Sequence, residues 1–369
     1  MLRSGVLPDR AYLYPLEAGM TESILELRNV EKYFGDFVAV ERINLEVKKG
    51  EFFTIVGPSG SGKTTMIRML VGMDKPSRGD ILMSGERVND VPANRRPTCM
   101  VFQSLALFPH KTVGENIEFP LKLRGETKNN RKTRAIQLLE QLHLSEAYYA
   151  KKVSECSGGE KQRVALARAL AFDPEILFFD EPLSALDYRL RKTLEKELKD
   201  IQRRTGKTFV YITHSLEEAM VMSDRISIMR DGRIVQIGTP DEIYNKPANS
   251  FVAQFMGEVN QFNVTRQEDA RFLDTDTQDS YVGPPGADLE SGILIVRPER
   301  IQILAEGEAA DTEIAGTVQN QYVLGSRVQY EVKVKKRSLL VETMIGDEWN
   351  VGESVRLGWN SDQAFLLAR

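Results

Sequence analysis

The order of hydrophobic and polar residues predicts strands that alternate with helices over the first two thirds of the chain. Residues 24–30 and 43–47 alternate apolar and polar positions, as strands with one buried face do. Apolar runs at 52–56, 98–102, 175–179 and 208–213 are typical of strands buried on both faces. We therefore expect an antiparallel layer that leads into the parallel sheet of an α/β fold.

Helical spacing occupies the segments between these strands, at residues 66–71, 113–123, 131–144, 161–171, 188–205 and 216–222. The helix at 188–205 carries Leu190, Leu194, Leu198 and Ile201 along one stripe. Two successive helices without an intervening strand predict a helical subdomain, about residues 104–157, inserted into the α/β core. Within it, the basic run at 124–134 is expected to be a solvated loop.

The pattern changes again after residue 257. Long helical periods end, Gly283-Pro284-Pro285-Gly286 interrupts the chain, and short alternating strands such as 328–334 and 355–359 follow. We expect a 21–257 α/β domain and a small all-β barrel at 258–369. Residues 1–20 precede the folded pattern and lack the apolar core of a signal peptide, so we expect a disordered extension or a misplaced start codon.

Composition narrows the class of protein. The 369 residues carry a net charge of −4, so nothing indicates binding to nucleic acid. Two cysteines fit a reducing cytosol better than a disulfide framework. No apolar run approaches the ~20 residues that span a bilayer, so work at a membrane would require docking on an embedded partner.

A glycine-rich loop between a buried strand and a helix carries the strongest chemical signal. It matches the pattern G-x-x-x-x-G-K-[ST] and consists of Gly57, Pro58, Ser59, Gly60, Ser61, Gly62, Lys63, Thr64 and Thr65. Backbone N–H groups of such a loop curl around an anion, and the following helix adds its partial positive charge. We expect Lys63 to reach the β- and γ-phosphates of a nucleotide, and the Thr64 hydroxyl to bind Mg²⁺.

Polar residues follow the ends of the other buried strands, where open α/β sheets bind ligands. Asp180 is placed to hold Mg²⁺ and Glu181 to polarise an attacking water, although an Asp-Glu pair after a strand is also a common turn. Gln103 could contact both metal and water, and His214 could bond the γ-phosphate. A second potential anion-binding site opens a helix at Ser157, Gly158, Gly159 and Glu160.

In this order, these residues resemble the ATP-binding subunits of ATP-binding-cassette (ABC) transporters, over about residues 24–257. The resemblance implies a P-loop NTPase cassette with antiparallel β and helical subdomains. It makes 57–65 the Walker A loop, Gln103 the Q-loop, 176–181 the Walker B strand, Ser184 to Asp187 the D-loop and His214 the switch histidine. The family signature Leu-Ser-Gly-Gly-Gln reads Cys156 to Glu160 here, which places a negative charge near a phosphate.

The resemblance also implies ATP and Mg²⁺ as cofactors. It implies that Thr64, Gln103 and Asp180 hold the metal, that Glu181 is the catalytic base, and that Phe34, with Tyr33 as the alternative, stacks on the base. A homodimer would place ATP between the Walker A loop of one chain and the signature of the other, with Asp187 nearby.

The C-terminal segment resembles the OB-like TOBE domain of bacterial importer ATPases, and the whole chain looks closest to the polyamine and ferric-iron branch. Polyamine import is the expected function, with ferric iron, phosphonate, sugar or oxyanion import as alternatives. Transmembrane permease subunits, and indirectly an extracytoplasmic substrate-binding protein, are the expected partners at the cytoplasmic face of the membrane. A soluble cassette ATPase or a non-catalytic sensor is the competing class.

Overall fold

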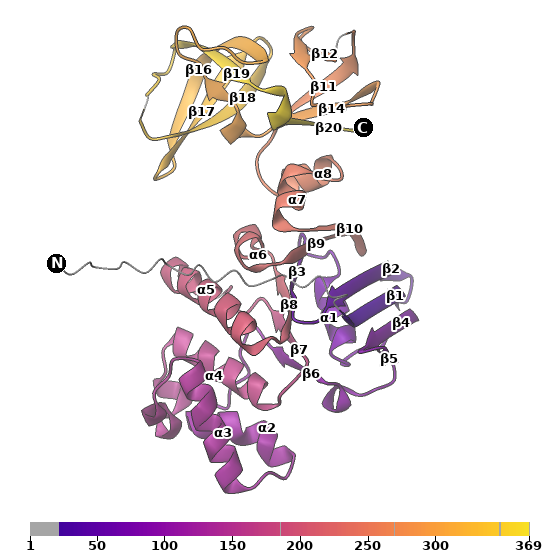
Figure 1. Ribbon diagram of the computed structural model, residues 1–369, viewed down its shortest axis with the longest axis vertical. Coiled ribbons are helices and arrows are strands. Elements are labelled where there is room, and N and C mark those ends of the chain that lie inside the picture. Colours follow the sequence, from indigo (N-terminus) through magenta and orange to yellow (C-terminus); the bar gives the residue numbers. More distant parts are fainter. Residues whose placement is uncertain (1–21, 185, 269, 347, 369) are drawn as a thin grey trace, which may run out of the picture.

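The computed structural model describes residues 22–184, 186–268, 270–346 and 348–368. The predicted extension at 1–20 and the D-loop position Ala185 lie outside the described residues. The predicted fold class is confirmed: an α/β domain with an antiparallel β layer and a helical subdomain precedes an all-β region (Figure 1).

The antiparallel layer begins with a long hairpin. β1 (Ser23–Phe34) and β2 (Phe37–Lys48) pair along their length, and β4 (Arg78–Met83) and β5 (Glu86–Arg87) complete a sheet of order β2-β1-β4-β5. The alternating positions Leu25, Leu27, Leu45 and Val47 are buried, which is why the sequence pattern identified this layer.

The central sheet has the order β10-β9-β3-β8-β7-β6. Its strands β3, β6, β7, β8 and β9 run parallel, and β10 pairs antiparallel with β9. Their bounds are β3 Phe52–Val56, β6 Thr98–Val101, β7 Ile176–Asp180, β8 Thr208–Thr213, β9 Arg225–Arg230 and β10 Arg233–Gly238.

Different helices cover the two faces of this sheet. Phe178, on one face, packs in a core with helix α1 (Lys63–Leu70) and the β1–β2 layer. Phe179, on the other face, packs in a core with α4 (Gly158–Ala171) and α5 (Tyr188–Thr205). Successive residues of a strand point to opposite faces of its sheet, so the neighbours Phe178 and Phe179 mark the two faces. Helices α1 and α4 therefore lie on opposite sides of the sheet.

The helical subdomain contains α2 (Val113–Leu123), α3 (Lys128–Gln141) and the short 3₁₀ helices Glu146–Ala150 and Val153–Glu155. The prediction that 124–134 is a solvated loop is wrong for its second half. The Thr127 hydroxyl accepts a hydrogen bond from the Asn130 N–H, and this cap starts α3 at Lys128. Another 3₁₀ turn, Ala93–Arg95, precedes β6.

Three short helices lie near the end of the α/β domain, one between β8 and β9 and two after β10. α6 (Leu216–Met222) was predicted, whereas α7 (Pro240–Asn245) and α8 (Ser250–Phe255) were not. Six residues give too little periodicity to recognise. α7 and α8 connect the two regions of the chain: the buried Arg297 donates to the Tyr244 carbonyl at 2.9 Å, and Ala253 packs against Ile295.

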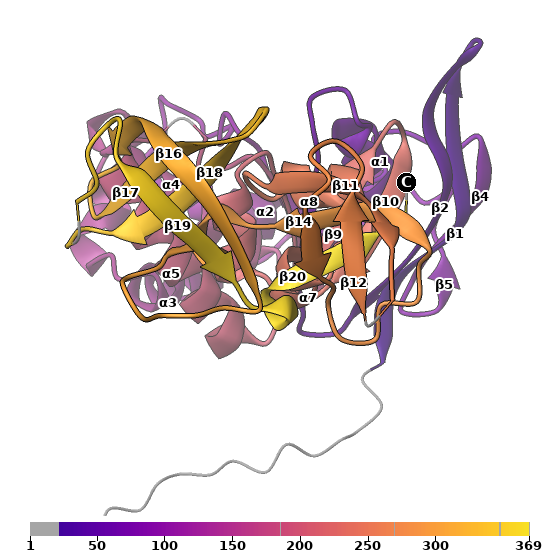
Figure 2. The same cartoon turned by 90° about the horizontal axis from the view of Figure 1, so that it is seen from above.

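The C-terminal region has two five-stranded sheets, β13-β12-β11-β14-β20 and β15-β19-β16-β17-β18. Figure 2 shows them side by side above the α/β domain. Phe262 and Trp359 stack in the core that both sheets share. The strands are β11 Asn260–Arg266, β12 Arg271–Asp274, β13 Ser280–Val282, β14 Ser291–Val296, β15 Gln302–Ile303, β16 Thr312–Val323, β17 Arg327–Val334, β18 Arg337–Met344, β19 Ser354–Trp359 and β20 Ala364–Leu367, with 3₁₀ turns at Pro298–Arg300 and Ser361–Gln363.

Candidate functional site

The glycine-rich loop joins β3 to α1, as its motif requires. Lys63 folds back over the loop, and its Nζ donates hydrogen bonds to the carbonyls of Gly57 at 2.7 Å and Pro58 at 2.9 Å. Ser61 is buried, whereas Pro58, Ser59, Gly60 and Thr64 are exposed. A depression of about 240 Å³ over Gly60 to Thr65 leaves room for a phosphate chain.

Gly62 is required by its surroundings and by its backbone angle. Its φ is +99°, and a Cβ there would lie 2.5 Å from the Ala39 carbonyl oxygen. The turn between β9 and β10 supports the same loop, because the Gly232 N–H donates to the Ser61 carbonyl at 3.1 Å. The motif gave no indication of this hydrogen bond, because Gly232 is far from Ser61 in the sequence. The two residues meet only because β9 pairs with β3 in the folded sheet.

Asp180 and Glu181 lie at the carboxyl end of β7, close to Lys63. Burial raises the pKa of Asp180, and the neighbouring Glu181 carboxylate raises it further. Burial lowers the pKa of Lys63, while Glu181 and Asp180 act against that change. Glu181 has a φ of +45°, an uncommon conformation for a residue with a side chain, and its N–H bonds to the Ile212 carbonyl at 2.9 Å.

A chain of polar contacts joins three predicted site residues. Glu181 Oε2 lies 3.1 Å from His214 Nδ1. Gln103 Nε2 donates to Ser184 Oγ at 3.0 Å, and this hydroxyl donates to the Glu181 carbonyl at 2.9 Å. The ends of β6, β7 and β8 therefore place Gln103, Glu181 and His214 together, as the position of these residues after parallel strands predicts. Ser184 is the bridging residue, a role that sequence alone did not assign.

Arg168 of α4 is a second residue that the motifs missed. Its guanidinium donates to the carbonyls of Ala106 at 2.7 Å and Leu105 at 2.8 Å, both of which have positive φ. The segment that follows Gln103 is therefore attached to the helix that begins with the signature residues.

Glu160 does not extend freely from the start of α4. Ser157 and Glu160 form a capping box: Glu160 N–H donates to Ser157 Oγ at 3.3 Å, and Ser157 N–H donates to the Glu160 carboxylate at 2.8 Å. Tyr148 O–H also donates to this carboxylate at 2.6 Å, and Lys151 Nζ lies 3.2 Å away. These partners, Tyr148 first, lower the pKa of Glu160 to about 2. The negative charge introduced by the signature variant is therefore balanced inside its own subdomain.

The remaining signature residues differ in exposure. Ser157 and Gly158 are exposed, whereas Gly159 is buried against Leu190 of α5. Cys156 is buried in the core of the helical subdomain, as a small apolar residue would be.

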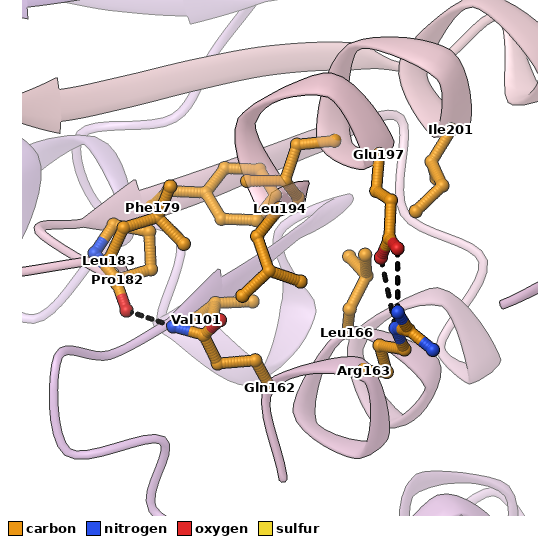
Figure 3. Close-up of a pocket in the computed structure, with 11 residues that line it drawn as sticks. Val101, Gln162, Arg163, Leu166, Phe179, Pro182, Leu183, Leu194, Glu197 and Ile201 are labelled. Carbon is orange, nitrogen blue, oxygen red and sulfur yellow. Dashed lines mark hydrogen bonds and ion pairs between the residues drawn. The ribbon is translucent and has the colours of Figure 1, made fainter. Parts of the chain in front are cut away.

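Figure 3 shows how the signature helix is attached to the Walker B side of the site. Gln162 of α4 donates to the Pro182 carbonyl just after Glu181, and Arg163 forms two hydrogen bonds to the Glu197 carboxylate of α5, at 2.9 Å and 2.6 Å. A small apolar cavity of about 30 Å³ lies between these contacts. α4 is therefore attached to the backbone directly after Glu181.

The aromatic residues lie at the tip of the β1–β2 hairpin. Phe34 is half exposed and pairs across the turn with Phe37, which is 64% exposed and borders the depression over the glycine-rich loop. Tyr33 O–H bonds to the Glu31 carboxylate. Phe37 is an aromatic candidate that the sequence argument missed. Asp187 caps α5, where its carboxylate accepts the Leu190 N–H at 3.0 Å.

Oxygen groups from three elements suit Mg²⁺: the Asp180 carboxylate, the Thr64 hydroxyl and the Gln103 amide. Among the described residues, no group of three or more His, Cys, Asp or Glu side chains forms a metal cage. This sparse set fits an ion that keeps water and phosphate oxygens as ligands.

The parallel sheet, the phosphate-binding loop and the adjacent Asp-Glu pair define a nucleotide-binding P-loop ATPase. Family models match residues 40–184 as ABC transporter and 294–367 as TOBE domain. The spermidine/putrescine import ATP-binding protein PotA of Roseobacter denitrificans is 45% identical over 83% of this chain and 85% of its own length. The PotA of Thermotoga maritima is 38% identical over 93% and 97%. The chain belongs to the ATP-binding proteins of ABC transporters, and it is a transport ATPase.

Solved structures agree with this assignment. The dimeric, post-hydrolysis ATP-binding cassette MJ0796 bound to ADP and Pi is 34% identical, with a TM-score of 0.52 over 59% of this chain and 99% of that one. CbiO1 of Clostridium perfringens is 28% identical, with a TM-score of 0.56 over 60% and 90%.

Proposed function

We propose that this chain hydrolyses Mg²⁺-ATP to power a bacterial importer, and that polyamines are the cargo. The observation that carries the hydrolytic role is the contact chain Gln103–Ser184–Glu181–His214 beside the Walker A loop. In this proposal Glu181 accepts a proton from the water that attacks the γ-phosphorus, while the bond to the ADP oxygen breaks. His214 orients that carboxylate and contacts the γ-phosphate.

The loop residues 57–65 would hold the phosphates, with Lys63 at the β- and γ-phosphates and Phe34 or Tyr33 at the base. Thr64, Asp180 and Gln103 would hold Mg²⁺, which neutralises charge on the phosphates. Asp180 is suited to this role because burial makes its ionised carboxylate unfavourable, which raises its pKa. A bound Mg²⁺ would stabilise the ionised carboxylate.

A homodimer is proposed from the two faces of the sheet. The Walker A helix α1 packs on one face, and the signature helix α4 packs on the other. One chain therefore cannot bring both helix N-termini to the same γ-phosphate, whereas a second chain can supply Ser157, Gly158, Gly159 and Glu160 with Asp187 nearby. Nucleotide would then close the dimer and hydrolysis would open it.

Docking on permease subunits is proposed at an apolar groove of about 290 Å³. Its apolar lining comes from the end of α1, from β6 and the residue after it, and from the end of α4, all outside residues 104–157: Val71, Met73, Met100, Phe102 and Phe172. Val113 and Asn116 are fully buried and unavailable to a partner.

Polyamines are proposed because the relatives quoted above are named for spermidine and putrescine import. Ferric iron, phosphonate, sugar and oxyanion import remain the alternatives, because a separate binding protein and permease would select the cargo. The proposed location is the cytoplasmic face of the cell membrane, as a peripheral subunit. Within the part of the chain that the structure describes, no helix is both long and apolar enough to cross a membrane.

The proposed division of the chain places the cassette at 21–257 and the TOBE-like domain at 258–369. The helical subdomain would span about 104–157.

The test is reconstitution in lipid vesicles with polyamine-importer permease subunits and their substrate-binding protein. Wild type should hydrolyse ATP in a Mg²⁺-dependent manner and support uptake of labelled spermidine. Glu181→Gln should bind ATP, form a stable dimer and lose turnover by about 10²-fold or more. Normal turnover by Glu181→Gln would show that another group is the base. Uptake of ferric iron, phosphonate, sugar or an oxyanion without uptake of spermidine would show that polyamines are not the cargo.

A further inference from the structure

We propose that the turn between α2 and α3 binds the headgroups of anionic phospholipids beside the permease. We call residues 122–134 the basic turn: they are the end of α2, the connecting residues 124–127 and the start of α3. The inference rests on the proposed function, because it takes the chain to be docked on a membrane partner.

Charge separates the basic turn from the rest of the molecule. It holds six basic residues and one acidic residue in a chain with a net charge of −4. Lys122, Lys128 and Lys132 are exposed, and among the described residues they form no ion pair. Elsewhere surface cations such as Lys199 and Arg233 are paired with carboxylates.

Positive charge exceeds negative charge at the start of α3, where Glu126, just before the cap and bonded to Asn130, is the one acidic residue of 122–134. The first turn of α3 contains no acidic residue and begins with Lys128, so cations lie where the helix dipole is positive. Lys128 and Lys132 are also four residues apart, and like charges at that spacing destabilise a helix. An arrangement that is unfavourable for helix stability indicates a binding role when it lies at the surface. A bound phosphate would neutralise the lysines and would also accept hydrogen bonds from the N–H groups at the start of α3.

The turn is nevertheless rigidly built. Arg131 pairs with Glu118 at 3.2 Å and donates to the Glu126 carbonyl at 2.7 Å, and Gly125 takes a φ of +80° that reverses the chain. Arg131 is therefore committed to structure, whereas Lys122, Lys128 and Lys132 stay exposed, with the Lys132 ammonium 5.5 Å from the centre of the Tyr149 ring.

An apolar side chain lies within this positive surface. Leu123 is 74% exposed between Lys122 and Arg124, the most exposed large apolar residue in the described chain. A single leucine ringed by cations fits a bilayer interface, where it enters the acyl boundary while the cations meet phosphates.

Position supports a membrane rather than a soluble acidic partner. The Arg124 guanidinium lies 4.0 Å from the centre of the Phe172 ring, and Phe172 lines the proposed permease groove. The basic turn therefore borders the surface on which an embedded partner would dock. Figure 1 shows α2 and α3 at the end of the molecule opposite the C-terminal β sheets.

The test is co-sedimentation of the full-length chain with vesicles of phosphatidylcholine alone or mixed with phosphatidylglycerol. The wild type should associate with the mixed vesicles only, and ~1 M salt, which shortens the Debye length to ~3 Å, should abolish this. Each of Lys122→Gln, Lys128→Gln and Lys132→Gln should lower the partition coefficient roughly fivefold, and the triple variant roughly a hundredfold. Leu123→Ser should lower it roughly fivefold at low salt, where the wild type binds.

The matched control is the triple variant Lys49→Gln, Lys246→Gln, Lys336→Gln, which removes the same charge from other exposed positions. It should bind as wild type does. Equal binding to neutral vesicles, or an equal loss in the control, would overturn the proposal. The proposal would also be overturned by a basic-turn variant that still binds vesicles but no longer assembles with the permease in detergent. That result would show that the basic turn contacts the permease and not lipid. ATP turnover in detergent tests the proposed function separately.

Discussion

The substitution Glu160→Gln restores the last residue of the family signature, and it tests how the glutamate is stabilised in this chain. The Glu160 carboxylate accepts hydrogen bonds from Tyr148 and the Ser157 N–H and pairs with Lys151. Charge-assisted bonds contribute about 1.5–3 kcal/mol each, against about 0.5–1.5 for neutral ones. Because the Glu160 side chain is 24% exposed, solvent screening reduces the loss, and we expect the free energy of unfolding to fall by about 1–2 kcal/mol.

The pH dependence follows from the direction of the shift. The pKa of Glu160 is about 2 in the folded chain, against an ordinary value of 4.5. A lowered pKa stabilises the folded state above the ordinary value, and this contribution is lost as the pH falls toward the folded value. The difference between wild type and Glu160→Gln should therefore be constant from about pH 7 to 5 and shrink below about pH 4.5.

The assay is urea unfolding followed by far-ultraviolet circular dichroism, because both tryptophans, Trp349 and Trp359, lie in the C-terminal region. A double-mutant cycle with Lys151→Met isolates the ion pair, for which we expect a coupling of about 1 kcal/mol. Zero coupling, or faster ATP hydrolysis by Glu160→Gln without loss of stability, would mean that the carboxylate faces the nucleotide and would refute this reasoning.

Three further substitutions test other parts of the structure. Gly62→Ala should abolish binding of a fluorescent ATP analogue, because its Cβ would meet a backbone carbonyl at 2.5 Å; normal affinity would contradict the loop geometry. Ser184→Ala should keep nucleotide affinity but lower turnover about tenfold, because it removes the hydroxyl that links Gln103 to Glu181. Unchanged steady-state turnover would show that this link has no role in hydrolysis. Arg337→Met should destabilise the C-terminal region by about 3–5 kcal/mol, measured by tryptophan fluorescence, because the buried Asp274 carboxylate loses its cation and keeps only neutral donors such as Tyr281. A variant as stable as wild type would show that Asp274 does not need its partner.

Local chemistry explains which helix boundaries were predictable. The helix at Tyr188–Thr205 was predicted with its observed bounds, because Asp187 caps its start and Gly206 takes φ +61° at its end. The start of α3 was missed, because the basic residues after Thr127 resemble a solvated loop. α7 and α8 were missed because each has only six residues, too few for a helical period to show, although Thr239, Pro240 and Glu242 form a capping signal at the start of α7.

The sequence by itself determined the α/β class, the phosphate-binding loop and the set of polar residues that follow buried strands. These features depend on side-chain periodicity and on glycines at fixed spacing, both of which are local. Only the tertiary structure decided which groups meet: Ser184 between Gln103 and Glu181, Gly232 against the glycine-rich loop, and Lys151 with Tyr148 around Glu160. Such pairs depend on strand order and helix packing, because residues far apart in the chain become neighbours only when the sheet assembles.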